Sequence, residues 1–245
     1  MNPVLTPPDM DLPDHTQLPA RDGRTSDDFR LRPQGVLLLD SLRPELKRLH
    51  PDDRYLIGVK VGIHWREDDE PLRGSKSPDW YYVPNVPPML DGTCRRSYVL
   101  WKEHKPPLIV LEFVSGDGSE ERDQTPETGK FWVYEQANRV AYYGIVESEL
   151  SGLEMYHLVQ GRYQRMTPNA QGRFLIPELG VELGGWHGTF ENMTLPWLRW
   201  WGAQGNMLQT GHEMAEQERQ AREKAEKRAE LLAAKLRALG ADPEA

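Results

Sequence analysis

The residues of this sequence that could perform chemistry are mostly acidic. Asp79 opens an apolar run in SPDWYYVP, and Glu112 lies inside another, PPLIVLEFV. An ionised carboxylate buried alone is very costly, so Glu112 should be paired, protonated or bound to a metal. Two carboxylates at the ends of neighbouring strands would form a hard-oxygen site suited to Mg²⁺ or Mn²⁺. Lys130 could then orient a water nucleophile or stabilise charge on a phosphate, which is the chemistry of phosphodiester hydrolysis.

Simpler structural roles are also open to these residues. Asp79 could cap a turn after Pro78, and Lys130 could pair with Glu127 or Glu135. Spacing alone slightly favours these roles, but Glu112 is harder to explain because its neighbours on both sides are apolar. Further acidic residues follow in the next loop, namely Asp117, Glu120, Glu121 and Asp123. The motifs of phosphate-binding loops, serine hydrolases and zinc proteases are absent, and the single Cys94 leaves no thiolate zinc cluster.

The apolar periodicity predicts the elements that would position these residues. Leucines at helical spacing indicate a helix over 36–49, and Pro44 should kink or split it. A two-residue repeat predicts a strand over 55–65. A helix should begin at Thr125, which could cap it, and run to about Asn138. Further strands are expected at 79–83, 108–114 and 141–147, followed by a hairpin over 153–166 that turns at 160–161 and short extended pieces over 173–184. This order predicts an α/β or α+β fold built on a mixed sheet.

The two ends of the chain differ from its centre. Residues 1–34 contain six prolines and six aspartates and are expected to form an extended or disordered arm. Residues 203–245 are rich in Ala, Glu, Lys and Arg, which predicts a charged helical tail. A 4-3 spacing fits a weak coiled coil, and a solvated single helix fits as well; the spaced residues are Ala225, Ala229, Leu232, Leu236 and Leu239. The predicted domain between these ends covers 35–202.

Charge and composition narrow the class of protein. The formal net charge is −8, which is unusual for a protein that coats nucleic acid but does not exclude a local basic groove. No stretch approaches the roughly 18 apolar residues of a membrane span, and no signal peptide is visible. We therefore expect a cytoplasmic protein.

Three segments together resemble a known family. PDWYYV, IVLEFVS and GKFWVYEQANRVAYYGIVE resemble the Uma-type restriction endonuclease family, within the PD-(D/E)XK nuclease superfamily, over roughly residues 30–185. The resemblance implies a restriction-endonuclease-like mixed sheet flanked by helices, with a divalent-metal site. Asp79 matches the Asp of the PD motif and Glu112 the Glu of the (D/E)XK strand. The superfamily lysine would fall at Val114, and Lys130 on the following helix matches the residue that replaces it.

One feature of the family is missing, and two functions remain open. Many relatives carry an acidic residue near the first helix, where this chain reads LRPQG. The resemblance implies a metal-dependent endonuclease in which Asp79 and Glu112 hold Mg²⁺ (or Mn²⁺) and Lys130 assists the attacking water. Its partner would be nucleic acid, with DNA favoured, and the tail could support a weak homo-oligomer. The alternative is a non-catalytic nuclease-like fold that binds nucleic acid or a protein through its tail. Besides these two functions, the chain could be a purely structural oligomer.

Overall fold

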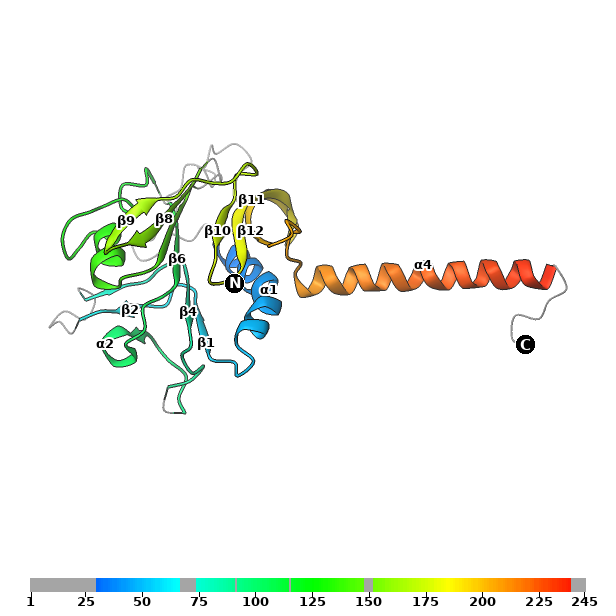
Figure 1. Ribbon diagram of the computed structural model, residues 1–245, viewed down its shortest axis with the longest axis horizontal. Coiled ribbons are helices and arrows are strands. Elements are labelled where there is room, and N and C mark those ends of the chain that lie inside the picture. Colours follow the sequence, from blue (N-terminus) through cyan, green and yellow to red (C-terminus); the bar gives the residue numbers. More distant parts are fainter. Residues whose placement is uncertain (1–29, 67–73, 91, 115, 148–151, 239–245) are drawn as a thin grey trace, which may run out of the picture.

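A six-stranded mixed sheet forms the centre of the computed structural model (Figure 1). The model describes residues 30–66, 74–90, 92–114, 116–147 and 152–238. The sheet has the order β1-β4-β6-β7-β8-β9, in which β6 and β7 are parallel and the other neighbours antiparallel. Its strands are β1 (Tyr55–Gly58), β4 (Trp80–Pro84), β6 (Ile109–Phe113), β7 (Tyr142–Val146), β8 (Leu153–Val159) and β9 (Arg162–Arg165). The predicted fold class, a mixed sheet flanked by helices, is confirmed.

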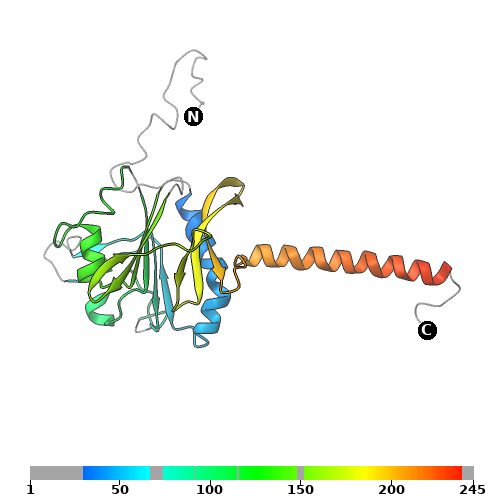
Figure 2. The same cartoon turned by 45° about the horizontal axis from the view of Figure 1, so that its top comes forward.

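Helix α1 (Leu31–Leu49) and a second sheet cover one face of the central sheet (Figure 2). That sheet consists of β10 (Phe174–Ile176), β11 (Val181–Phe190) and β12 (Met193–Gly202). The leucines of α1 pack against Trp80 and Trp200 in one apolar cluster. The helix is also tied to β12, because the Trp200 indole N–H donates to the Leu38 carbonyl at 3.0 Å. Strand β12, near residue 200, therefore holds α1, the first helix of the domain, in place.

The opposite face of the central sheet is covered by smaller elements. They are β2 (Ile63–His64), β3 (Ser75–Lys76), β5 (Tyr98–Val99), α2 (Leu100–Glu103), α3 (Lys130–Trp132) and the π-helix η1 (Val133–Ala137). Their apolar residues join the other face of β4, β6 and β7 in a second cluster. Strand β6 is thus covered on both faces, as its unbroken apolar run predicts, and Glu112 lies between two apolar layers.

Three local predictions are wrong. Helix α1 begins at Leu31, so residues 31–34 of the predicted arm are helical, and the helix is not split at Pro44, because Leu42 and Leu46 on either side of the proline are both buried against the sheet. The strand expected over 55–65 is interrupted between β1 and β2, where Lys60 adopts a left-handed φ of 55°. The helix expected from Thr125 begins at Lys130 instead.

The late helix start has a backbone cause. Glu127 has a φ of 66°, which a right-handed helix cannot contain, so residues 125–129 form a turn. The Gly129 N–H donates to the Thr125 carbonyl at 2.8 Å, and the Thr125 hydroxyl contacts Asp123 at 2.6 Å rather than capping the helix. Lys130 is therefore the first residue of α3 and not a residue one turn inside a longer helix.

The hairpin and the tail follow the sequence more closely. Strands β8 and β9 meet at Gln160 and Gly161, both with positive φ, so the predicted turn is confirmed. Helix α4 (Gly211–Ala238) extends away from the body of the molecule (Figure 1). Residues 1–29 of the predicted arm, and Leu239 of the proposed seam, lie outside the described residues. Within the described part of the chain, no helix is long and apolar enough to cross a membrane.

Candidate active site

The Asp79 carboxylate is fixed at the start of β4. Its side chain is almost fully buried, and the backbone N–H of Phe113 donates to Oδ2 at 2.6 Å. The Lys60 ammonium forms an ion pair with the other oxygen, Oδ1. Trp80 pairs with Leu111 in the antiparallel ladder of β4 and β6, so Asp79 lies beside the strand end that carries Glu112. The bond to Phe113 shows that Asp79 does more than cap a turn after Pro78.

Glu112 is buried at the centre of this arrangement, with an exposed fraction of 2%. The Lys130 ammonium donates to Oε2 at 3.3 Å, and the Tyr134 hydroxyl donates to Oε1 at 2.5 Å. Burial raises the pKa of the Glu112 carboxyl, and the nearby Asp79 raises it further, while Lys130 and Tyr134 oppose the rise. The Glu112 carboxylate is therefore paired, yet its proton is held more tightly than in an exposed glutamate.

Lys130 connects Glu112 to the acidic loop that follows β6. Its ammonium lies 3.0 Å from Glu121 Oε1 and 3.1 Å from Glu120 Oε1. Burial disfavours the charged form, but Glu112 and Glu121 outweigh it and keep the pKa of Lys130 above its ordinary value. Lys130 therefore stays protonated at neutral pH.

The alternative partners expected for Lys130 are engaged elsewhere. Glu127 pairs with Arg66 at 2.7 Å, and Glu135 pairs with Arg162 at 3.2 Å. The carboxylates around Lys130 are instead Glu112 and the two glutamates of the acidic loop.

A π-helix aims Tyr134 at Glu112. In η1 the Asn138 N–H donates to the Val133 carbonyl at 2.8 Å, five residues earlier, which widens the helix by one residue. The Tyr134 ring packs 5.0 Å from that of Tyr143, and Phe131 packs edge-on against Tyr143 at 5.9 Å. Such π-helical turns occur often at functional sites. Here the turn and the aromatic packing hold the hydroxyl that hydrogen-bonds Glu112.

Three further residues belong to the site, and the sequence did not single them out. Glu121 has an exposed fraction of 1%, and its Oε2 finds no hydrogen-bond partner among the described residues. Lys76 on β3 is half-buried, and its pKa is lowered by burial and then by the Lys130 ammonium. Lys60 holds Asp79. In the sequence, Glu121 is one of four acidic residues in a loop, and nothing distinguishes it from the other three. Lys60 lies in an alternating run, where a lysine is expected to be an ordinary surface residue.

The donor set fits a small divalent cation only in part. Asp79 and Glu112 supply two hard-oxygen carboxylates, and Glu121 Oε2 is a buried oxygen that lacks a partner in the described structure. No three His, Cys, Asp or Glu side chains within the described ranges are grouped closely enough to hold an ion by themselves. Mg²⁺ commonly binds one or two carboxylates and completes its shell with water and substrate phosphates. Asp79 and Glu112 are carboxylates of the kind that such an ion uses, and their role as ligands stays a prediction.

Comparison with known proteins places the chain in a family. The model of the Uma2 family, described as "Putative restriction endonuclease", matches residues 27–193, which is more than half of the chain. The chain belongs to the Uma2 family. The predicted family is thus confirmed, and Uma2 membership supports a nuclease-like function.

Two other comparisons are less informative. No curated protein gives a significant match. Among solved structures, a "putative nuclease" from Anabaena variabilis is similar with a TM-score of 0.39 and 11% sequence identity, over 60% of this chain and 73% of that chain.

Proposed function

We propose that this Uma2 chain is a metal-dependent endonuclease that hydrolyses phosphodiester bonds in nucleic acid, with DNA as the favoured substrate. The observation that carries the proposal is the meeting of two buried carboxylates, Asp79 and Glu112, with the Lys130 ammonium at one end of β4 and β6. Family membership supports the same class of reaction.

Each residue has a role that its environment allows. Asp79 and Glu112 would hold Mg²⁺ or Mn²⁺, and their rigid surroundings would keep both carboxylates in place. The bound ion would supply Lewis-acid polarisation of the phosphate and a more acidic water. Lys130, with its raised pKa, keeps its proton and can donate a hydrogen bond to the attacking water or to a phosphate oxygen. Lys130 is therefore suited to orient the water or to stabilise negative charge on the phosphate. It is not suited to act as the base that accepts a proton.

The test is cleavage by the full chain and three variants. Plasmid DNA, single-stranded DNA and RNA are incubated with Mg²⁺ or Mn²⁺, and with a chelator as the negative control. We expect Asp79→Asn and Glu112→Gln to lose metal binding and cleavage, and Lys130→Ala to lose turnover while it still binds the ion. Glu230→Gln, an exposed carboxylate on α4, is the matched control and should cleave like the wild type. Equal Mn²⁺ binding by wild type and Glu112→Gln in calorimetry would show that Glu112 is not a ligand.

A second candidate function is a non-catalytic nuclease-like module that binds nucleic acid or a protein through its tail. Two observations favour it: lysines already neutralise Asp79 and Glu112, and α4 extends away from the domain (Figure 1). This candidate predicts no cleavage of any substrate by a folded chain, even where Mn²⁺ binds through Glu112.

A further inference from the structure

Lys60 is held at the site by its backbone as well as by its charge. Its φ of 55° is left-handed, a conformation that is strained for a non-glycine residue. Its N–H donates at 3.0 Å to the carbonyl of Pro78, the residue directly before Asp79. This turn interrupts the strand that the sequence predicts over 55–65 and places the Lys60 side chain over Asp79.

The two oxygens of Asp79 have different partners. Oδ2 accepts the hydrogen bond from the Phe113 backbone at 2.6 Å, and that bond is part of the contact between β4 and β6. Oδ1 lies against the Lys60 ammonium in an ion pair but accepts no hydrogen bond from the described residues. Oδ1 makes no backbone hydrogen bond, so it is the Asp79 oxygen that a cation can approach without competing with the contact between β4 and β6, and the Lys60 ammonium is paired with that same oxygen.

We propose that Lys60 occupies the metal-facing oxygen of Asp79 in the metal-free site, is displaced when the ion binds, and then contacts the phosphodiester backbone of the substrate. This inference rests on the proposed function and adds a positioning residue to it. A dication and an ammonium at one carboxylate oxygen weaken each other's binding, because like charges a few ångströms apart repel at the effective dielectric of a protein surface.

The displaced Lys60 ammonium is free to turn outward, and a substrate phosphate would attract it. The Lys60 side chain is 34% exposed, so its flexible stem can turn outward without unpacking the core. Lys130 remains engaged by Glu112, Glu120 and Glu121. A phosphate of the substrate then offers Lys60 a new anionic partner in place of Asp79. Metal and substrate should consequently strengthen each other's binding, and the coupling must be reciprocal.

The test measures Mn²⁺ affinity by calorimetry on the full chain, first without nucleic acid. Lys60→Met removes the competing charge and should bind Mn²⁺ at least roughly tenfold more tightly than the wild type, because one repulsive charge is gone. Lys60→Arg keeps the charge and should match the wild type, as should Lys224→Met on the distant α4. Lys60→Gln is the second neutral variant in case the methionine variant fails to fold, which circular dichroism checks.

The second arm adds a phosphorothioate-linked DNA duplex, which resists hydrolysis. In the wild type the duplex should tighten Mn²⁺ binding, because its phosphates pair with the Lys60 ammonium in place of Asp79. In Lys60→Met the duplex should tighten Mn²⁺ binding several-fold less. Unchanged or weaker Mn²⁺ binding by both neutral variants, beside measurable binding by the wild type, would overturn the role of Lys60 and leave the proposed nuclease intact. Absence of Mn²⁺ binding from the wild type and all variants would overturn both. Equal tightening by duplex in wild type and Lys60→Met would overturn the contact with substrate.

Discussion

At the scale of single residues, the environment of Glu112 explains how a carboxylate can lie inside an apolar strand. Tyr134 and Lys130 satisfy one oxygen each, so the group is hydrogen-bonded although it is buried. Burial still raises its pKa, which means that the protonated form is unusually stable in the metal-free chain. Charge on Glu112 is thus costly without a cation.

This cost predicts a pH dependence of stability in the metal-free chain. Burial raises the pKa of Glu112 from an ordinary 4.5 to about 8. Between these values the folded chain holds a proton that the unfolded chain releases, so the free energy of unfolding falls as pH rises through this window. Wild type should therefore lose stability relative to Glu112→Gln from about pH 4.5 to about pH 8, and the difference should level off above that.

Urea unfolding of both proteins, in a chelator and at several pH values, measures this difference. Parallel stability curves across the window would show that Glu112 does not retain its proton. A metal that binds Glu112 must displace the same proton, so Mn²⁺ affinity measured by calorimetry should rise with pH over this range.

At the scale of elements, the turn before α3 decides where Lys130 points. Gly129 is buried at the end of this turn, and a Cβ built there would lie 2.2 Å from the backbone oxygen of Asp123. The same oxygen accepts the Phe131 N–H at 3.0 Å. The turn, the first residues of α3 and the Lys130 ammonium are therefore positioned together.

A pair of variants tests the turn. Gly129→Ala forces the backbone apart and should cost about 1–3 kcal/mol of stability, as overpacked sites do. It should also reduce turnover more than metal affinity, because Lys130 is the next residue. Thr125→Ala removes only an exposed hydroxyl bond to Asp123 and should cost about 1 kcal/mol or less. Chemical unfolding and calorimetry measure both variants. Equal losses of stability would contradict the assigned geometry of the turn.

At the scale of the whole molecule, the contacts that join α4 to the rest of the described chain lie near the first residues of the helix. Arg199, whose side chain is fully buried on β12, donates to both oxygens of Glu213 at 3.0 and 2.7 Å. The Thr210 hydroxyl accepts the Glu213 N–H at 3.1 Å, and the Glu213 carboxylate accepts the Thr210 N–H at 2.7 Å, which forms a capping box.

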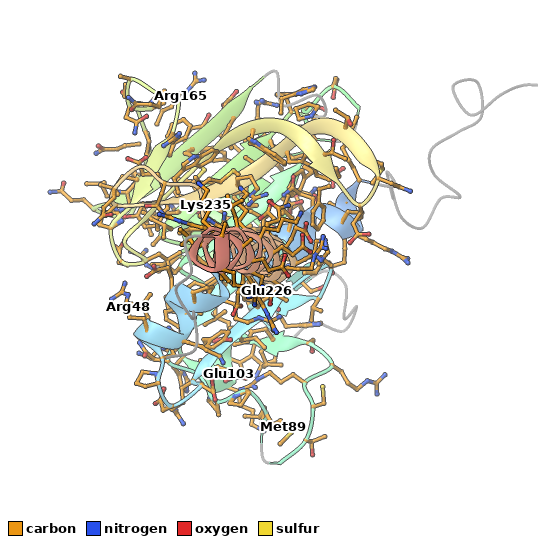
Figure 3. The ribbon with its side chains drawn as sticks, turned by 90° about the vertical axis from the view of Figure 1, so that its right-hand side faces the viewer. Arg48, Met89, Glu103, Arg165, Glu226 and Lys235 are labelled. Carbon is orange, nitrogen blue, oxygen red and sulfur yellow. The ribbon has the colours of Figure 1, made fainter. Side chains whose placement is uncertain are left out.

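Farther along, the helix is a solvated rod. Lys235 and Glu226 lie on opposite sides of its axis in Figure 3. Every described side chain beyond Glu216 is exposed or only partly covered. The described residues of the proposed seam include Leu232, which is 51% exposed. Intrahelical ion pairs such as Arg219 with Glu223 at 2.9 Å support such a helix without a partner. Weak association through the tail stays a prediction.

Two truncations separate the anchored part of α4 from the free part. A chain that ends at Gln220 keeps Glu213 and should unfold like the full chain. A chain that ends at Gly205 leaves Arg199 buried without its partner and should lose about 2 kcal/mol or more, less than the ~3–5 kcal/mol of a fully buried pair because Glu213 is partly exposed. Denaturant unfolding measures both, and sedimentation of the longer chain tests association. Equal stability of the two truncations would show that the Arg199–Glu213 pair contributes nothing.

Features that depend on local residue patterns could be predicted from the amino-acid sequence. Alternating or unbroken apolar runs located β4, β6, β7 and the β8–β9 hairpin, and the polar helical composition located α4. The family phrases singled out Asp79, Glu112 and Lys130, and the structure brings these three residues together, although their roles in metal binding and catalysis stay predictions.

Features that depend on contacts between distant segments could not be predicted in this way and follow from the folded arrangement. Lys60 reaches Asp79 because a left-handed residue breaks a strand whose alternation gives no sign of it. The late start of α3 follows from a positive φ at Glu127, which residue type does not signal. Helix α1 continues past Pro44 because it packs against β12. Helix α4 is attached to the domain because the buried Arg199 pairs with Glu213. At Lys60, Pro44 and Arg199 the local preference of the sequence is weaker than the free energy gained by burial or by pairing a buried charge.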